Sequence, residues 1–216
     1  MASNSGRSGE LRIGPSVRVR CGVVDVLDRA VEAQRRWGRV PLVERIAVVD
    51  RMRQVMVADA DAIGAEISAE MGRPIAYSPN EIRRGFDERA RHMAALAPSC
   101  LADLSAGDDG VIRRFIRPTP VGVVLVLAPW NYPYLTSVNA IVPALLAGNS
   151  VVLKMSSQTP TVAHRYAAAF AAAALGAAAD GDRLQIGARR SIACEAAPGA
   201  APSAEGERGT WRRLRS

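Results

Sequence analysis

The sequence predicts an α/β fold in which several N-terminal helices precede a parallel strand–helix–strand unit. Residues 42–67 carry apolar side chains at three- and four-residue steps, the period of an amphipathic helix. Residues 121–127 form a continuous Val/Leu run, typical of a strand buried on both faces of a parallel sheet. A helix-length apolar segment and a second short apolar run, 151–153, follow it. Strand, helix and strand in this order indicate a parallel pair with a right-handed crossover.

Composition bounds the classes of partner that the chain can have. It has 216 residues, of which 49% are hydrophobic and 5% aromatic, so its core must be built mostly from Ala, Val, Leu and Ile. The formal net charge of +7 suggests an acidic partner such as nucleic acid. However, the basic residues are almost all arginine, are scattered over helical faces, and have no aromatic residues between them for base stacking. A basic nucleic-acid-binding protein is therefore a hypothesis that we set aside, and we expect no nucleic-acid partner.

The sequence carries no sign of export or membrane insertion. The polar opening, residues 1–14, lacks the apolar core of a signal peptide. The apolar run 121–128 is too short to span a bilayer and is closed by Pro129. The three cysteines are widely spaced and form no C-x-x-C pair for metal or redox chemistry. We expect a cytoplasmic protein with no membrane contact and no metal site.

The N-terminal region begins with a polar arm and a first helix. Residues 1–20 are rich in Gly, Ser and Arg, and we predict a disordered arm. From Val23 the pattern becomes helical, and the apolar side chains on one face are Val24, Leu27, Val31 and Trp37.

The second predicted helix is long and amphipathic. It begins after Pro41, which suits the first turn of a helix. It should stop at Met71, because Gly72 can adopt the left-handed cap and Pro74 blocks continuation.

The third predicted helix has a capping-box start. The Ser78 hydroxyl can cap the amide three residues on, Glu81 can return a bond, and Pro79 suits the first helical position. We expect this helix to run to about Leu96, before Pro98.

The remaining elements follow in order. Residues 101–110 are loop-like, and the alternation over 111–117 predicts an edge or two-sided strand. After the strand at 121–127 we expect a crossover helix over 135–147 and, after strand 151–153, a helix started by a Thr-Pro cap at 159–160. Residues 175–216 have no sustained apolar period and many Gly and Pro, and predict a disordered Ala/Gly/Arg-rich tail.

Two distinctive clusters follow the two buried strands directly. Ala-Pro-Trp-Asn-Tyr-Pro, residues 128–133, follows the first strand, and its two prolines should present Asn131 rigidly. Lys-Met-Ser-Ser-Gln-Thr-Pro, residues 154–160, follows the second. Ligands of parallel α/β sheets bind outside the carboxyl ends of strands, so both clusters are candidate ligand-binding segments.

The order and spacing of these clusters resemble the NAD(P)-dependent aldehyde dehydrogenase superfamily. Pro-Val-Gly-Val at 120–123, Pro-Ala-Leu-Leu-Ala-Gly-Asn at 143–149 and the upstream Glu-Met-Gly-Arg-Pro at 70–74 match as well. The resemblance covers about residues 23–170. It implies that residues 21–174 form a partial cofactor-binding domain, made of N-terminal helices and the first half of the family's Rossmann-like sheet.

The resemblance also implies roles for individual residues. In the family a cysteine thiolate attacks the aldehyde, a side-chain amide stabilises the oxyanion, hydride passes to the nicotinamide, and a glutamate-activated water hydrolyses the thioester. Asn131 matches the amide donor, and Lys154 matches the lysine that bonds the adenosine ribose hydroxyls. Contacts along the dinucleotide match Leu127, Ala128, Pro129 and Trp130.

Cofactor choice depends on one departure from the family pattern. Ser157 stands where many NAD-preferring members carry a glutamate, whose carboxylate accepts bonds from a ribose 2′-hydroxyl and repels a 2′-phosphate. The cofactor implied is therefore NAD or NADP, with NADP tolerated because of Ser157. Met155 replaces the usual proline and should loosen the loop slightly.

The family's Glu-Leu-Gly-Gly and Gly-Gln-x-Cys segments are not found in the sequence, and the neighbours of Cys194 do not match the latter. We therefore expect a truncated or frameshifted member that is inactive alone, the aldehyde being the substrate of the parental enzyme. The alternative is a non-catalytic binding or regulatory fragment that pairs with a full-length homologue. A homo-oligomer is also possible, since the family uses the region of Arg113 to Arg117 in its oligomerisation sheet.

Overall fold

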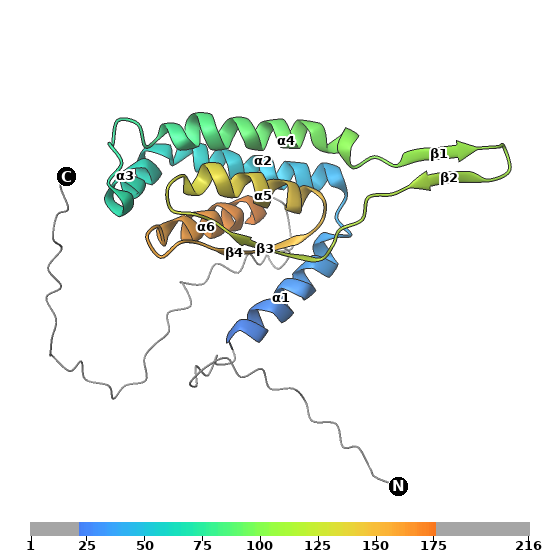
Figure 1. Ribbon diagram of the computed structural model, residues 1–216, viewed down its shortest axis with the longest axis horizontal. Helices are drawn as coiled ribbons and strands as arrows, with labels where there is room; N and C mark the ends of the chain where they lie inside the picture. Colours follow the sequence, from blue (N-terminus) through green and yellow to red (C-terminus); the bar gives the residue numbers. More distant parts are fainter. Residues whose placement is uncertain (1–21, 176–216) are drawn as a thin grey trace, which may run out of the picture.

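A computed structural model describes residues 22–175 (Figure 1). The predicted arm lies outside these residues, and so does the predicted tail except for Leu175. The elements, in chain order, are α1 (Gly22–Trp37), α2 (Leu42–Ala58), α3 (Ala60–Met71), the π-helix η1 (Glu81–Phe86), α4 (Asp87–Cys100), β1 (Leu104–Asp108), β2 (Arg113–Ile116), β3 (Val123–Leu127), α5 (Pro133–Leu146), β4 (Ser150–Lys154) and α6 (Thr161–Leu175).

A parallel strand pair and its crossover helix form the centre of the fold. β3 and β4 pair in parallel from Val123 opposite Ser150 to Leu127 opposite Lys154, and α5 connects them. Helix α5 packs on both strands, α4 packs on α5, and α2 packs on α6. Figure 1 shows α2, α4 and α5 above the strands and α1 below them. The predicted α/β class is confirmed.

Strand β3 is less buried than its sequence predicts. Val126 is buried, but Leu125 is 62% and Leu127 68% exposed. The expectation of burial on both faces is therefore wrong for the described residues. Within them β3 pairs with β4 alone, and its contacts with α5 and α1 leave Leu125 and Leu127 exposed.

The predicted long amphipathic helix is present but broken. Met52, Met56, Ile63 and Ile67 are buried as the pattern requires. However, α2 ends and α3 begins at Asp59, which has φ −89° and ψ 9°. The Asp59 carboxylate accepts a bond from Arg165 of α6 at 3.0 Å, a tertiary contact for which the local sequence gives no signal. Gly72 ends α3 in the left-handed conformation, φ 74°, as predicted.

Two expectations for residues 96–110 are wrong. Helix α4 runs through Pro98 to Cys100. The proline lacks one backbone donor, and the helix ends two residues after it. The expected loop contains β1, which pairs antiparallel with β2, the predicted strand. The β1–β2 hairpin is exposed along its length and projects from the helical body (Figure 1).

Helix α1 buries a different face from the one that its large apolar residues suggested. Trp37 is buried, and its indole N–H donates to the Leu145 carbonyl at 2.8 Å. Small residues bring α1 close to β4, where the Ser150 hydroxyl donates to the Ala30 carbonyl at 2.8 Å. The other three residues of the expected face are exposed: Val24, Leu27 and Val31.

Three aromatic rings join the helical layer. Tyr166 of α6 lies edge-on to Phe86 of η1 at 6.1 Å and against Tyr134 of α5 at 5.6 Å. Burial raises the pKa of Tyr166, so its hydroxyl stays protonated. That hydroxyl shares a hydrogen bond with the Ser137 hydroxyl at 2.9 Å.

Gly64 lets the segment after α3 pack against that helix. A Cβ at this position would lie 2.6 Å from Cγ of Pro79 and 2.8 Å from its backbone nitrogen. Gly64→Ala should therefore lower the free energy of unfolding by about 1–2 kcal/mol, because overpacking outweighs the gain in helix propensity. Denaturant unfolding checks this, with Ala65→Gly at the next, exposed position as a control for propensity. Stabilisation by Gly64→Ala would contradict the packing.

Candidate functional site

The two loops that follow β3 and β4 leave the sheet at the same edge. Leu127 and Lys154 are register partners, and the Ala128 amide donates to the Lys154 carbonyl at 3.0 Å. Three of the predicted site residues are thereby brought together. Asn131 and Ser157 lie in the two loops that continue from this edge.

Most of the predicted site residues present their side chains to solvent. Ala128 is buried, and the exposed ones are Leu127, Pro129, Trp130, Asn131, Lys154 and Ser157. The Lys154 ammonium makes one long bond, 3.4 Å, to the Met155 carbonyl. Met155 is itself buried in the core, so the residue expected to loosen this loop anchors it. Lys154 is also the only lysine among 28 basic residues.

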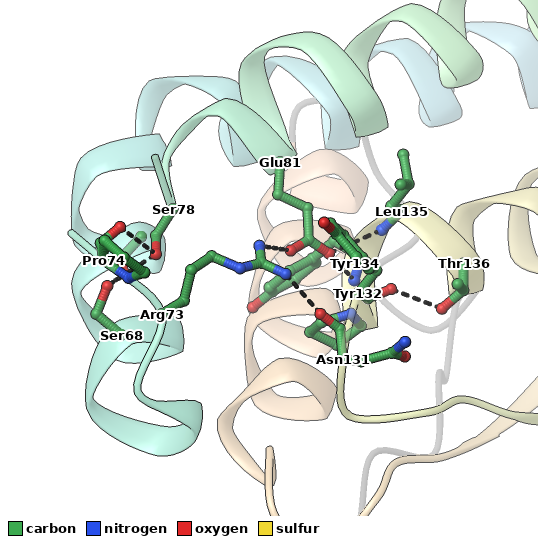
Figure 2. A network of polar contacts seen from close by, with 12 residues as sticks. Ser68, Arg73, Pro74, Ser78, Glu81, Asn131, Tyr132, Tyr134, Leu135 and Thr136 are labelled. Atoms are coloured by element: carbon green, nitrogen blue, oxygen red, sulfur yellow. Dashed lines mark hydrogen bonds and ion pairs between the residues drawn. The ribbon is translucent and has the colours of Figure 1, made fainter. Parts of the chain in front are cut away.

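Asn131 is held through its backbone. Its carbonyl accepts a hydrogen bond from the Arg73 guanidinium at 2.5 Å, and the same guanidinium lies 4.5 Å from the ring centroid of Tyr132. Among the described residues the Asn131 side-chain amide has no hydrogen-bond partner, and it points away from Arg73 (Figure 2). The amide is free to donate to a ligand.

The N-terminus of α5 is capped by a residue far away in the sequence. Pro133 occupies the first helical position and has no amide hydrogen. The next two amides, of Tyr134 and Leu135, donate to one carboxylate oxygen of Glu81 at 2.8 and 3.0 Å. The other oxygen of Glu81 pairs with Arg73 (Figure 2). A helix N-terminus is a ready anion site, and here the anion is part of the protein.

The predicted capping box at the third helix is therefore wrong. The Glu81 side chain bonds α5 and not its own helix, and the Ser78 hydroxyl bonds the Ser68 hydroxyl at 2.8 Å. The helix begins with the π-helix η1. Asn80, the residue before η1, is already in the right-handed helical conformation, and its side chain does not cap the helix.

The cap predicted for the last helix is also replaced by a distant carboxylate. Helix α6 begins after Pro160 as expected, but the amide of Thr161 donates to Glu70 at 3.0 Å. The hydroxyl of Thr159, predicted to cap, is buried without a partner. Glu70 and Glu81 lie on either side of the bend at residues 72–74, so this short stretch caps both helices that follow the strands.

Arg73, Glu81 and Glu70 are the residues that reasoning from sequence missed at this site. A local capping box accounted for Glu81, and Arg73 was only part of a helix-ending Gly-Arg-Pro bend. Their partners lie 53 to 91 residues away in the chain, so the local pattern gave no signal.

Comparison with known proteins identifies the family of this arrangement. The aldehyde dehydrogenase family model matches residues 21–179. The chain belongs to the aldehyde dehydrogenase family. The resemblance stated from the sequence is thus confirmed. The two motifs that carried it follow the strands of a folded βαβ unit.

Relatives within the aldehyde dehydrogenase family are similar over part of their length. A Mycolicibacterium smegmatis protein named for succinate-semialdehyde dehydrogenase, NADP(+), is 37% identical over 134 residues, which are 61% of this chain and 26% of that protein. The 3,6-anhydro-alpha-L-galactose dehydrogenase of Streptomyces coelicolor is 36% identical over the same fractions. The chain therefore spans about a quarter of the length of these relatives.

Solved aldehyde dehydrogenase structures share the fold. The succinic semialdehyde dehydrogenase of Streptococcus pyogenes, in complex with NADP+, superposes with a TM-score of 0.62 at 25% identity, over 80% of this chain and 37% of that one. An NADP-dependent glyceraldehyde-3-phosphate dehydrogenase of Bacillus halodurans gives 0.64 at 29% identity, over 70% and 33%.

Two further findings concern residues 22–175 only. None of the helices there has the length and apolarity needed to cross a membrane. That part of the chain also holds no group of three or more potential metal-ligating side chains. Cys194 lies outside the described residues.

Proposed function

We propose that this chain supplies part of the NAD(P) site and the oxyanion donor of an aldehyde dehydrogenase. The observation that carries the proposal is the register that pairs Leu127 with Lys154 and so joins the two motif-bearing loops at one sheet edge. Parallel sheets bind ligands at this edge. Membership of the family supports a dinucleotide as that ligand.

Lys154 is the proposed contact to the adenosine ribose. Its exposed ammonium has three donors and one weak internal bond, so it can donate to vicinal hydroxyls. All other basic positions of the chain are arginine, which supports a need for a compact ammonium at this one.

The residues present fit a dinucleotide along the rest of this edge. Leu127 and Trp130, 68% and 45% exposed, offer apolar surface to the planar parts of the cofactor. Glu81 fills the α5 N-terminus, so we propose that the cofactor phosphates bind elsewhere, because a second anion there would be repelled.

Asn131 is the proposed oxyanion donor. Its free side-chain amide can donate to the aldehyde oxygen as negative charge develops there, a contribution whose loss typically costs ~10²–10³ in rate. The cofactor, when bound, supplies the hydride acceptor. The role of Asn131 is to hold an N–H donor in place before charge develops.

Other groups must complete the reaction. Cys100, the free cysteine of residues 22–175, is exposed at the end of α4 beside the hairpin and not in either strand-end loop. We propose that the nucleophile and base come from outside the described residues and that these residues alone do not oxidise aldehydes. Two of the similar proteins are named for succinate semialdehyde, so this is the first aldehyde to test.

Lys154→Ala tests the cofactor site. We expect the wild-type chain to bind NADP+ and the variant to bind it roughly 10-fold more weakly, the equivalent of one charge-assisted hydrogen bond. Isothermal titration calorimetry measures both. Arg39→Ala is the matched control, because it removes an exposed positive charge far from the proposed site. Its neighbour Gly38 lies next to Gly148, at the opposite end of β4 from Lys154. Equal affinities of wild type and Lys154→Ala would refute the assignment.

A second candidate function is pairing with a full-length homologue. The observation that favours it is the exposed apolar face of β3, where Leu125 is 62% and Leu127 68% exposed, together with Val121 just before the strand, which is 85% exposed. Unpaired strand edges and apolar faces of this kind recruit further strands or chains. The exposed β1–β2 hairpin is a second surface suited to oligomerisation.

Leu125→Asp tests this pairing. We expect the wild-type chain to form a stable complex with a full-length homologue in size-exclusion chromatography with light scattering, and the variant to lose it. Val43→Asp adds the same charge on α2, at a site that is 72% exposed, and should leave the complex intact. A complex that survives Leu125→Asp, or no complex with wild type, would exclude β3 as the docking face.

A further inference from the structure

Two charged residues from the N-terminal helical region anchor the Asn131 loop, residues 128–132 between β3 and α5. Arg73 follows the left-handed Gly72 and Glu81 opens η1, so both come from the stretch between α3 and α4. The Glu81 side chain is 1% exposed and that of Arg73 14% exposed. An ion pair this buried persists only when its remaining donors and acceptors are satisfied.

Apart from the bond between them, every side-chain hydrogen bond of this pair leads to residues 131–135. One Glu81 oxygen takes the amides of Tyr134 and Leu135, and the other takes Arg73. Arg73 then donates to the Asn131 carbonyl at 2.5 Å and lies over the Tyr132 ring. The pair thus bonds the backbone on both sides of the Tyr132–Pro133 junction (Figure 2).

We propose that Arg73 and Glu81 are positioning residues that fix the direction of the Asn131 side chain. The proposal rests on the proposed role of Asn131 as oxyanion donor. The anchors act on the backbone and leave the side-chain amide free, which is the arrangement that a preorganised donor needs. Since both anchors precede β1, the N-terminal helical region holds the Asn131 loop in place as well as covering the sheet.

The contrast with helix α2 supports a dedicated cap. The Tyr134 amide and the Val43 amide occupy equivalent second positions of their helices. Among the described residues no side chain accepts a bond from the Val43 amide, whereas the Tyr134 amide donates to the buried Glu81 carboxylate at 2.8 Å. First-turn amides normally bond to water or to short-range caps, so a charged acceptor that lies 53 residues away in the chain is an unusual means of fixing one loop.

Residue-resolved amide hydrogen exchange of the full chain tests the proposal. In the wild type we expect Tyr134 and Leu135 to exchange more slowly than Val43. In Glu81→Ala, exchange at the amides of residues 130–132, 134 and 135 should accelerate roughly 10- to 100-fold, the equivalent of a charged hydrogen bond, while buried amides of α2 and α6 stay unchanged. Glu81→Gln keeps an acceptor oxygen and should restore most of the protection at Tyr134 and Leu135.

Arg73 has a separable signature. Arg73→Lys keeps the charge but loses the fork that reaches Glu81 and Asn131 together, so exchange should accelerate at residues 130–132 more than at 134–135. Arg83→Ala is the matched control, because it breaks a 2.6 Å ion pair to Asp61 from the same π-helix and on an exposed surface. It should leave the loop unchanged.

The outcomes separate this proposal from the proposed function. Equal acceleration in all helices would mean that the pair only stabilises the fold, and no local change in any of the variants would mean that it does not anchor the loop. Either result overturns the proposal. Should Glu81→Ala not fold, Glu81→Gln and Arg73→Lys carry the same test. Failure of the wild-type chain to bind NADP+ would count against the cofactor site and leave the exchange result standing.

Discussion

Replacing Tyr166 with alanine is expected to lower the free energy of unfolding by about 3–5 kcal/mol, the usual cost of truncating a buried aromatic residue. Tyr166 is 1% exposed and contacts Phe86 of η1 and Tyr134 of α5, so its removal would leave a cavity where three elements meet. Against a typical domain stability of about 5–15 kcal/mol, this loss is a large share of the total. Denaturant unfolding followed by circular dichroism measures it.

Two variants control this measurement. Tyr166→Phe removes only the hydroxyl that bonds Ser137 at 2.9 Å and should cost about 1 kcal/mol. Tyr77→Ala removes a tyrosine that is 68% exposed and should cost less than about 0.5 kcal/mol. A loss for Tyr166→Ala no larger than that for Tyr77→Ala would show that the helical layer is not packed as described.

Ser157→Glu is expected to reduce the affinity for NADP+ relative to NAD+ by about 100-fold. The serine is exposed in the loop after β4, three residues beyond Lys154, where we place the adenosine ribose. A carboxylate there can accept a bond from a 2′-hydroxyl but repels a 2′-phosphate, and a like-charge contact of a few ångström costs several kcal/mol in a protein environment. Calorimetric titration with each cofactor gives the ratio.

Ser157→Gln separates charge from size. It adds nearly the same bulk without charge, so the ratio of NADP+ to NAD+ affinity should change little. Raising the salt concentration should reduce the discrimination by Ser157→Glu, because the contact is exposed and screened. An unchanged ratio in Ser157→Glu would mean that this residue does not face the ribose.

The sequence predicted the elements whose signal is local. The βαβ unit, the left-handed Gly72 and the buried positions of α2 and α3 each follow from periodicity or from a residue with one preferred conformation. The strand-end residues were also predicted, because a βαβ unit fixes which strand ends are adjacent. Lys154 and Leu127 are opposed for this topological reason.

What the sequence could not predict depends on tertiary contacts. Glu81 matched a local capping box, yet its carboxylate serves a helix 53 residues away, where two amides and Arg73 offer more than its own helix start could. Likewise α1 buries Ala30 and Ala33 instead of its larger side chains, because close approach to β4 selects small residues. Hydrophobicity alone could not reveal that choice.

Protection of Lys154 from acetylation is the most direct test of the central claim, that the paired ends of β3 and β4 bind the cofactor. Because Lys154 is the only lysine, an amine-reactive ester labels it and the terminal α-amino group, and mass spectrometry follows both rates in one sample. We predict that NADP+ slows acetylation of Lys154 in a saturable way and leaves the α-amino group unaffected. Equal rates at Lys154 with and without saturating NADP+ would contradict the claim.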